Sequence, residues 1–290
     1  MIKYAVLTDS ACDIPPELEK EYGIDIMNFD ITVDGKSYTE RVDFTCDEFY
    51  EIARNAEGVP TTSHITSIRF CEKYCEYEKQ GITEVLHVVI NKSGSATYDA
   101  SVMGEAQFRD EMPNSKLKIY RVDSHTYSMV YGFFVCEAAK KLKNGGEMGE
   151  VVRFLNDVFS RTEAVLSAYT LKFIKKSGRV SAAAAFAGEL LGLKPVISLI
   201  DGVSKVQSKV RGENLVMPAL VKFAKEHMDE HSRFYMVATT DDLHGAQLAA
   251  LCKKEFGYPP AAIFKLGAAI TINTGPEAVA LVYLGMARQR

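Results

Sequence analysis

The sequence predicts an α/β protein with two domains, a Rossmann-like N-terminal domain on a parallel sheet and a C-terminal domain on a mixed sheet. In the first half of the chain, short apolar β-type runs alternate with helical patterns, and this order produces parallel strands joined by right-handed crossovers. After Asn144-Gly145-Gly146 the pattern changes, and Asp201-Gly202 stands between two β-type runs as a type I′ hairpin signal. We therefore predict domains over residues 1–150 and 151–290.

Strands and helices are predicted to alternate through the first domain. Pro15 and Pro16 suit the first turn of a helix, and Gly23 suits the left-handed end of that helix. Asp34-Gly35 predicts a tight hairpin between two short strands. The predicted strands cover residues 4–7, 24–33, 36–38, 83–90 and 117–122, and the predicted helices cover residues 18–22, 47–54, 70–79, 97–109 and 128–142.

The second domain is predicted to contain at least one antiparallel pair of strands. Its hairpin at Asp201-Gly202 joins two β-type runs directly, which parallel strands cannot do. The predicted helices cover residues 148–159, 215–227 and 246–256, and the predicted strands cover residues 164–169, 196–200, 203–210, 234–238, 262–264 and 278–284.

Four short clusters of hydroxyl and Asp residues punctuate the first domain. They are Thr8-Asp9-Ser10, Thr61-Thr62-Ser63, Ser93-Gly94-Ser95 and Asp123-Ser124. In a parallel sheet, such clusters meet at the carboxyl edge of the strands, where open sheets bind ligands. Hydroxyls beside helix N-termini offer hydrogen-bond donors to an anion. Each cluster alone is explained equally well as a helix N-cap, but four together favour a shared binding site.

Composition and charge exclude several classes of protein. The formal net charge of −4 argues against nucleic-acid binding, which depends on Lys and Arg neutralising phosphates. The apolar stretch of residues 182–200 is interrupted by Glu189 and Lys194, so we expect no membrane span, although transient contact with a membrane surface stays open. The chain enters its first strand almost directly after Met1, without the pattern of a signal peptide. We therefore expect a cytoplasmic protein.

The six cysteines are dispersed along the chain. Cys71 and Cys75 share a helix face and could present two metal ligands. No cluster of His and Cys residues at metal-site spacing accompanies them. The sequence therefore predicts reduced, packed thiols and no metal.

The motifs of common catalytic and nucleotide sites are missing. Ser10 or Ser95 with His125 would be the only nucleophile and base pairs that the strand order permits, but there is no G-x-S-x-G elbow. There is also no P-loop and no G-x-G-x-x-G fingerprint. We therefore predict no catalytic residue and no cofactor. Two alternatives remain open: a transferase or hydrolase with a hydroxyl nucleophile, and a module that binds a small anion such as a phosphate ester.

A series of short motifs in order along nearly the whole chain resembles the DegV family of bacterial fatty-acid-binding proteins. The motifs are V-L-T-D-S-A-C-D-I-P from Val6, P-T-T-S at 60–63, S-A-T-Y at 95–98, V-D-S at 122–124, K-S-G-R-V-S at 176–181, L-K-P at 193–195 and N-T-G-P at 273–276. The resemblance implies two DegV-like α/β domains with a long-chain fatty acid between them. It also implies a partner, a fatty acid kinase, to which the bound carboxylate is presented for acyl phosphate formation.

The resemblance also implies roles for individual residues. By this resemblance, Thr62, Ser63 and Ser95 match the residues that bind the carboxylate. Arg211 and Asn273 match positions that face the phosphoryl group or the kinase. Asn273 replaces the usual His, and an amide can donate a hydrogen bond but carries no charge. The remaining residues of the predicted site are supporting ones, namely Asp9, Ser10 and Ser124. Three further departures from the family pattern are Ala96 for Gly, His64-Ile65 for Gln-Pro and Ser177 for Gly.

Physical magnitudes divide the work between the acyl chain and its head group. Burying roughly fifteen methylenes at about 0.8 kcal/mol each offers on the order of 12 kcal/mol before the costs of association. Hydrogen bonds to the carboxylate contribute about 1.5–3 kcal/mol each, much of which offsets desolvation. The chain thus supplies affinity and the hydroxyls supply orientation. The apolar residues considered for lining the chain are Phe173, Ile174, Leu190, Leu191, Ile197 and Phe264, each of which is equally suited to an ordinary core.

Overall fold

The computed structural model describes residues 3–181, 192–286 and 288, and the chain divides into two compact units. The first unit is Met1–Asp30 with Thr62–Phe159, and the second is Ile31–Thr61 with Ser160–Arg290. Residues 31–61, which the sequence reading assigns to the first domain, thus make their contacts with the second half of the chain. Leu190 and Leu191 lie outside the described residues.

A four-stranded parallel sheet with the order β2-β1-β6-β7 forms the centre of the first unit. Its strands are β1 (Tyr4–Asp9), β2 (Ile24–Met27), β6 (Glu84–Val89) and β7 (Lys118–Asp123). All three pairings are parallel, as the alternation of strand and helix predicts. Both faces are covered by helices, so β6 is an almost continuous apolar run from Val85 to Val89 with only His87 interrupting it.

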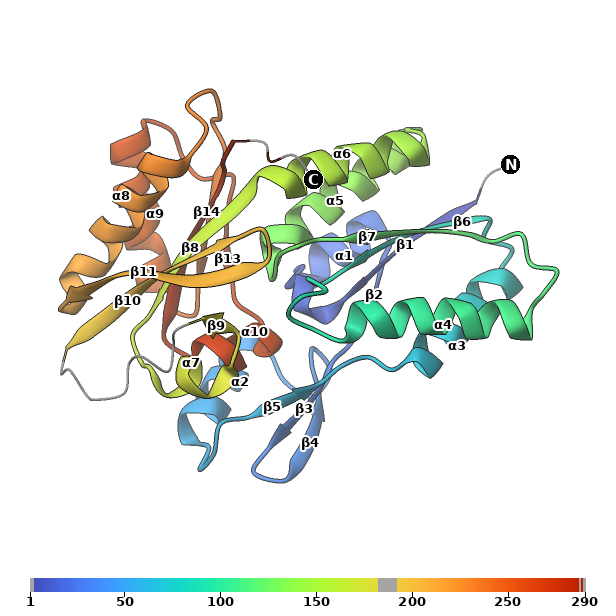
Figure 1. The fold of residues 1–290 in the computed structure, drawn as a ribbon, viewed down its shortest axis with the longest axis horizontal. Helices are drawn as coiled ribbons and strands as arrows, with labels where there is room; N and C mark the ends of the chain where they lie inside the picture. The colour runs from blue at the N-terminus through green and yellow to red at the C-terminus, as the bar shows by residue number, and fades with distance from the viewer. Residues whose placement is uncertain (1–2, 182–191, 287, 289–290) are drawn as a thin grey trace. The chain divides into compact units, whose positions relative to one another are not determined.

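Two pairs of helices cover this sheet (Figure 1). The helices α3 (Ser67–Lys79) and α4 (Thr97–Glu111) pack against each other on one face, and α1 (Pro16–Tyr22) and α5 (Met129–Lys143) pack on the other. The helix α6 (Met148–Arg161) follows α5. Gly23 ends α1 in the left-handed conformation with φ 62°, as its position after the helix predicts.

The second unit contains a seven-stranded mixed sheet with the order β13-β12-β14-β8-β10-β11-β9. Its strands are β8 (Thr162–Ala168), β9 (Val180–Ser181), β10 (Leu193–Ile200), β11 (Val203–Arg211), β12 (Tyr235–Thr239), β13 (Ala262–Lys265) and β14 (Ala278–Leu284). Asp201 and Gly202 both have positive φ and close the hairpin between β10 and β11, which confirms the turn signal. The parallel sheet and the mixed sheet together confirm the predicted fold class.

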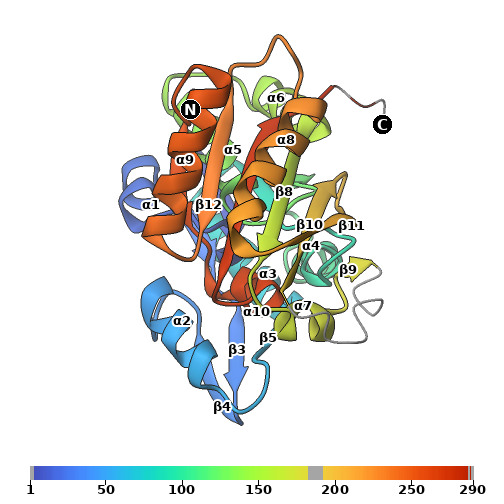
Figure 2. The ribbon, with the colours of Figure 1, turned by 90° about the vertical axis from the view of Figure 1, so that its left-hand side faces the viewer.

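Among the described residues, five helices complete the core of this unit, two against the sheet and three packed on one another. The helices α8 (Val216–His227) and α9 (Asp242–Phe256) lie side by side against the sheet, as Figure 2 shows, and bury Leu220, Leu248 and Leu281 in one cluster. The helix α2 (Cys46–Asn55) begins with a capping box between Thr45 and Glu48. It packs against α10 (Ala268–Thr274), and α10 packs against α7 (Lys172–Ser177).

Several local features of the described residues differ from the sequence prediction. The single strand predicted over residues 24–33 is two strands, β2 and β3 (Asp30–Val33), because the chain leaves the parallel sheet after Met27. β3 joins β4 (Lys36–Thr39) and β5 (Thr61–Ser63) in a separate sheet with the order β4-β3-β5. The helices α7 and α10 were not predicted, because six or seven residues are too few to show a helical period.

Candidate functional site

Three of the four hydroxyl clusters lie at the carboxyl ends of neighbouring parallel strands, as predicted. Thr8-Asp9 ends β1, Ser93-Gly94-Ser95 follows β6, and Asp123 ends β7. The fourth cluster is different, because Thr61–Ser63 is itself the strand β5 of the three-stranded sheet. It still precedes a helix of the first unit, since α3 begins at Ser67.

The loop between β6 and α4 is held by its own hydrogen bonds. Asn91 is fully buried, and its Oδ1 accepts from the Ser93 backbone N–H at 3.1 Å while its Nδ2 donates to the Tyr127 hydroxyl at 2.8 Å. The Gly94 N–H closes the turn by donating to the Asn91 carbonyl at 3.1 Å. Asn favours such turns because its side chain bonds the backbone two residues on. These hydrogen bonds within the protein fix the shape of the loop.

Position 94 requires glycine because the side chain of Tyr127 packs closely against it. A Cβ at this position would lie 1.9 Å from the Tyr127 hydroxyl oxygen and under 3 Å from the ring. The roles of Asn91 and Tyr127 and the close packing at Gly94 were not predicted from the sequence. The N-x-x-G spacing at residues 91–94 carried the only local signal, a turn, and the contact with Tyr127 is non-local.

Ser95 is partly buried and already has a hydrogen-bonding role in the protein. Its Oγ accepts from the Thr97 backbone N–H at 3.3 Å and donates to Thr97 Oγ1 at 2.9 Å. It thus serves the first turn of α4, which is the helix-capping explanation of its cluster. Because a hydroxyl proton can rotate, Ser95 can keep its acceptor role and donate to an anion instead of to Thr97.

Thr62 and Ser63 are more open. Thr62 is half-buried and Ser63 is exposed, and neither hydroxyl makes a hydrogen bond within the residues that the structure describes.

Thr62 precedes α3 and Ser95 precedes α4, two parallel helices that are in direct contact. Two contacts show that the helices run parallel. Gly104, in the middle of α4, lies against the carbonyl of Ser67 at the start of α3. Glu111, the last residue of α4, lies further along α3, beside Cys71 and Cys75. Both hydroxyls therefore belong to the N-terminal side of this helix pair.

The three supporting residues of the predicted site are buried and bonded to the protein. Asp9 accepts from the Ile90 N–H at 2.8 Å and from the Tyr131 hydroxyl at 2.6 Å. Burial and the Asp9 charge raise the pKa of Tyr131 well above its usual range, so the phenol stays a donor. Ser10 Oγ accepts from the Phe29 N–H at 2.9 Å, and Ser124 Oγ donates to the Thr126 carbonyl at 3.1 Å. These side chains join the strand ends to the loops around them.

Ser95 has no base beside it in the part of the chain that the structure describes. Its hydroxyl proton is directed to Thr97, and the only hydrogen-bond partner of Ser95 Oγ in the described part of the chain is that residue. His125 instead has its Nδ1 3.5 Å from Asp123 Oδ2. A nucleophilic Ser needs a base within hydrogen-bond reach, so this geometry disfavours the hydrolase alternative for Ser95.

Arg211 and Asn273 both lie in the second unit. Arg211 is the exposed last residue of β11, opposite Leu193 on β10, and it forms no ion pair with any described residue. Asn273 lies in α10 and is partly buried, and its Nδ2 donates to the Ala269 carbonyl one turn earlier at 2.9 Å. The amide of Asn273 is therefore engaged by its own helix.

The apolar residues considered for lining an acyl chain are buried where the structure describes them. Phe173 packs with residues of α2 and α10, and Ile174 packs with Ile197. Phe264 is 7% exposed.

The departures from the family pattern lie in different environments. Ile65 is buried and His64 is exposed. The Ser177 hydroxyl donates to the Ile174 carbonyl at the end of α7.

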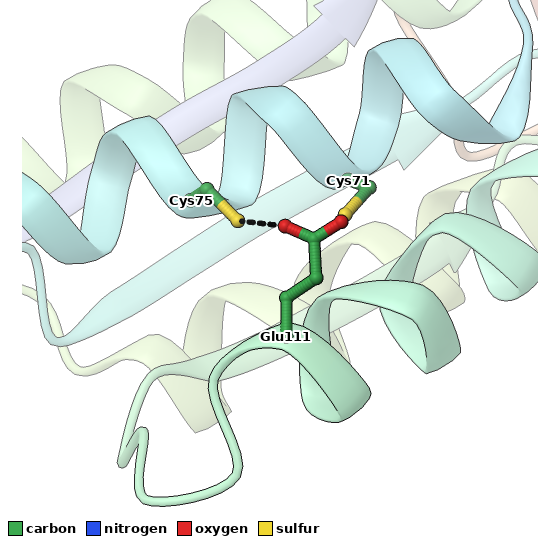
Figure 3. Close-up of side chains that lie close together, drawn as sticks. All are labelled: Cys71, Cys75 and Glu111. Carbon is green, nitrogen blue, oxygen red and sulfur yellow. Dashed lines mark hydrogen bonds between the residues drawn. The ribbon is translucent and has the colours of Figure 1, made fainter.

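One cluster of side chains in the described residues has the composition of a metal site. Cys71 and Cys75 of α3 lie beside Glu111, the last residue of α4, and Figure 3 shows the carboxylate between the two sulfurs. The Cys75 thiol donates to Glu111 Oε2 at 3.6 Å. Burial and the neighbouring Glu111 raise the pKa of Cys71 to about 12, so this thiol is protonated at neutral pH. Burial also raises the pKa of Cys75, which nearby Lys79 opposes.

No helix in the described residues is both long and apolar enough to cross a membrane.

Comparison with known families and proteins gives matches over nearly the whole chain. The family model described as "Uncharacterised protein, DegV family" matches residues 3–285. A DegV domain-containing protein of Clostridium perfringens is 27% identical over 281 residues, which cover 96% of this chain and 97% of that protein. Another, from Caldanaerobacter subterraneus, is 29% identical over 225 residues, which cover 78% of each chain.

Solved structures match equally completely. A fatty acid binding DegV family protein from Streptococcus agalactiae has a TM-score of 0.85 and 25% identity, with 99% of this chain and 100% of that chain covered. A DegV family protein from Thermus thermophilus, described for its fatty acid binding, has a TM-score of 0.84 and 25% identity, covering 98% and 100%. A stearic acid-binding protein from Eubacterium ventriosum has a TM-score of 0.88 over 97% and 98% of the chains, and its 21% identity supports likeness of fold.

Proposed function

The chain belongs to the DegV family, and from this premise we propose that it binds a long-chain fatty acid, with the carboxylate held by Thr62, Ser63 and Ser95. The observation that carries the proposal is the full-length likeness to the Streptococcus agalactiae protein, described as fatty acid binding, at 25% identity. The Thr-Ser pair at 62–63 and the Ser of S-A-T-Y at 95–98 keep hydroxyls where the family pattern has them.

The local geometry suits a carboxylate better than a reacting acyl group. Ser95 can turn its proton from Thr97 Oγ1 to a carboxylate oxygen, which exchanges a neutral hydrogen bond for a stronger charge-assisted one. Thr62 has no protein partner to give up among the described residues. The N-terminus of the 15-residue helix α4 adds favourable electrostatics for an anion. Asp9, Ser10 and Ser124 support the loops and do not need to touch the ligand.

Lipid analysis of the purified protein tests this proposal. We expect protein purified from a bacterial host to yield about one equivalent of long-chain fatty acid on solvent extraction and mass spectrometry. A phosphorylated metabolite in place of lipid would favour the small-anion alternative. A protein that is empty and also fails to bind added oleic acid would contradict the proposal.

The finer proposal is that the protein presents the bound carboxylate to a fatty acid kinase. Arg211 is suited to meet a phosphoryl group or an acidic partner surface, because it is exposed at a strand end without an ion-pair partner among the described residues. Asn273 is less suited than the His that the family has there, because its Nδ2 is bonded to Ala269 and it carries no charge.

Arg211→Ala and Asn273→His test this presentation in an assay coupled to a purified fatty acid kinase. We expect Arg211→Ala to lower acyl phosphate formation and Asn273→His to raise it, with fatty-acid affinity unchanged in both. Lys209→Ala, on the same strand, is the control for loss of a neighbouring positive charge. If Arg211→Ala loses lipid and turnover in parallel, Arg211 holds the carboxylate and its proposed role is wrong.

A further inference from the structure

Cys71, Cys75 and Glu111 form a compact set of metal-type donors far along the two helices from the hydroxyls discussed above. Their ligand atoms all lie within 4.8 Å of one another. Cys71 and Cys75 are 4% and 7% exposed, whereas Glu111 is exposed. Figure 3 shows Glu111 at the end of α4, with its side chain directed at the two cysteines. Only the two cysteines could be recognised from the sequence, because Glu111 lies 36 positions after Cys75.

The packing of α3 against α4 brings the three residues together. Cys71 and Cys75 are four positions apart in the sequence and share one face of α3. Gly104 lets α4 approach closely, since a Cβ there would lie 2.6 Å from both Phe70 Cβ and the Ser67 carbonyl oxygen. This contact sets the parallel alignment of the helices and places the last turn of α4 opposite the cysteines. A site formed in this way is largely preorganised.

We propose that Cys71, Cys75 and Glu111 bind one borderline-soft divalent cation of the Zn²⁺ type, with a water as the fourth ligand. Two thiolates and a carboxylate are a donor set that Zn²⁺ accepts in tetrahedral geometry. With Zn–S bonds of about 2.3 Å, the two sulfurs of such a site lie about 3.8 Å apart, which small side-chain rotations within the present 4.8 Å limit can reach.

The charges of the three ligands, the dication and the nearby Lys79 sum to zero. Binding releases one proton from each thiol, so two thiolates, one carboxylate and the dication leave a net charge of −1. Lys79 lies close enough to Cys75 to act on it electrostatically and offsets this charge. The exposed side of Glu111 gives the ion access to solvent. A bound ion would clamp α3 to α4, because its ligands come from both helices.

Cobalt is the probe for this site, because tetrahedral Co²⁺ absorbs visibly and its thiolate bonds give charge-transfer absorption. The experiment uses full-length protein, reduced and freed of metal with a chelator. We expect one equivalent of Co²⁺ to give both absorptions and Zn²⁺ to displace it. Cys71→Ser and Cys75→Ser should each abolish the charge-transfer band or halve it and weaken binding by more than about tenfold.

Glu111 provides variants that do not disturb the core, because its side chain is exposed. Glu111→Gln should weaken Co²⁺ binding by about tenfold, whereas Glu111→His, which supplies another zinc ligand, should retain it. Asp110→Asn is the matched control, since it removes a neighbouring exposed carboxylate from α4. This pair of Glu111 variants decides the question even if the cysteine variants do not fold.

Three results would overturn the proposal: no thiolate absorption with Co²⁺ in reduced wild-type protein, equal binding by Glu111→Gln and wild type, or unchanged absorption in Cys75→Ser. A mass two hydrogens lower under the same reducing conditions would also overturn it, because it would indicate a Cys71–Cys75 disulfide. Fatty-acid retention should be the same in all Glu111 variants, so the outcome is independent of the proposed lipid function.

Discussion

Thr62 and Ser95, two of the three residues proposed to hold the carboxylate, differ in the hydrogen bonds that their hydroxyls make within the protein. Ser95 stands in a loop closed by Asn91, packed at Gly94 and bonded to Thr97. Thr62 lies in the short strand β5, and its hydroxyl has no partner within the described residues. In the proposed complex, Ser95 exchanges its hydrogen bond to Thr97 for one to the carboxylate, whereas Thr62 gives up no hydrogen bond to a described residue. The comparison separates substitutions that affect the ligand alone from those that also affect the fold.

Removing both hydroxyls should have the largest effect. In Thr62→Ala/Ser95→Ala the carboxylate loses two of its three proposed side-chain donors, at about 1–3 kcal/mol each, so fatty-acid affinity should fall by about 2–6 kcal/mol. A fluorescent fatty-acid titration measures the loss. Ser93→Ala is the control, because Ser93 is an exposed hydroxyl in the same loop. Unchanged affinity in the double variant would place the head group elsewhere.

Crowding the prepared loop should have the next largest effect. Gly94→Ala places a methyl group against the Tyr127 hydroxyl and ring, so we expect a loss of about 1–3 kcal/mol in the free energy of unfolding, together with weaker lipid binding. Denaturant unfolding measures the stability. Gly149→Ala is the control, because the nearest atom to its Cβ would be Arg153 Nη1 at 3.7 Å, and this change should not destabilise. Equal stability of the two variants would show that the loop adapts.

The single hydroxyl deletions sharpen the contrast in stability. Ser95→Ala removes the acceptor for the Thr97 N–H and should cost about 0.5–2 kcal/mol in the free energy of unfolding. Thr62→Ala should stay within about 0.5 kcal/mol of wild type, because no partner among the described residues is lost. Denaturant unfolding without lipid checks both values. If Thr62→Ala proved the more destabilising, the proposed difference between the two sites would be reversed.

Tyr127→Phe should have a smaller effect on stability than Gly94→Ala. It removes the acceptor for Asn91 Nδ2 but keeps the ring, so we expect a loss of about 0.5–1.5 kcal/mol in the free energy of unfolding. Tyr98→Phe is the control, since the Tyr98 hydroxyl makes no hydrogen bond to a described residue. A Tyr127→Phe protein as stable as this control would mean that Asn91 does not depend on Tyr127 to hold the loop.

The parts of the fold that the sequence predicted are those set by local chemistry. The alternation of strand and helix led to the parallel sheet β2-β1-β6-β7, and Asp201-Gly202 led to the hairpin of β10 and β11. Gly23 ended α1 as expected. These features depend on the preferences of residues near one another in the chain, which is the information a single sequence carries. The hydroxyl clusters at the ends of β1, β6 and β7 followed from the same reasoning.

Tertiary structure alone decided the relations between distant segments. Residues 31–61 make their contacts with the second half of the chain because Phe49 of α2 packs in one cluster with Ala268 and Ile272 of α10. Tyr127 meets Gly94, and Glu111 meets Cys71 and Cys75, because packed helices and loops bring together residues that are tens of positions apart. The reason is physical: the hydrophobic effect rewards burial without specifying partners, so partners are fixed only when the whole core closes.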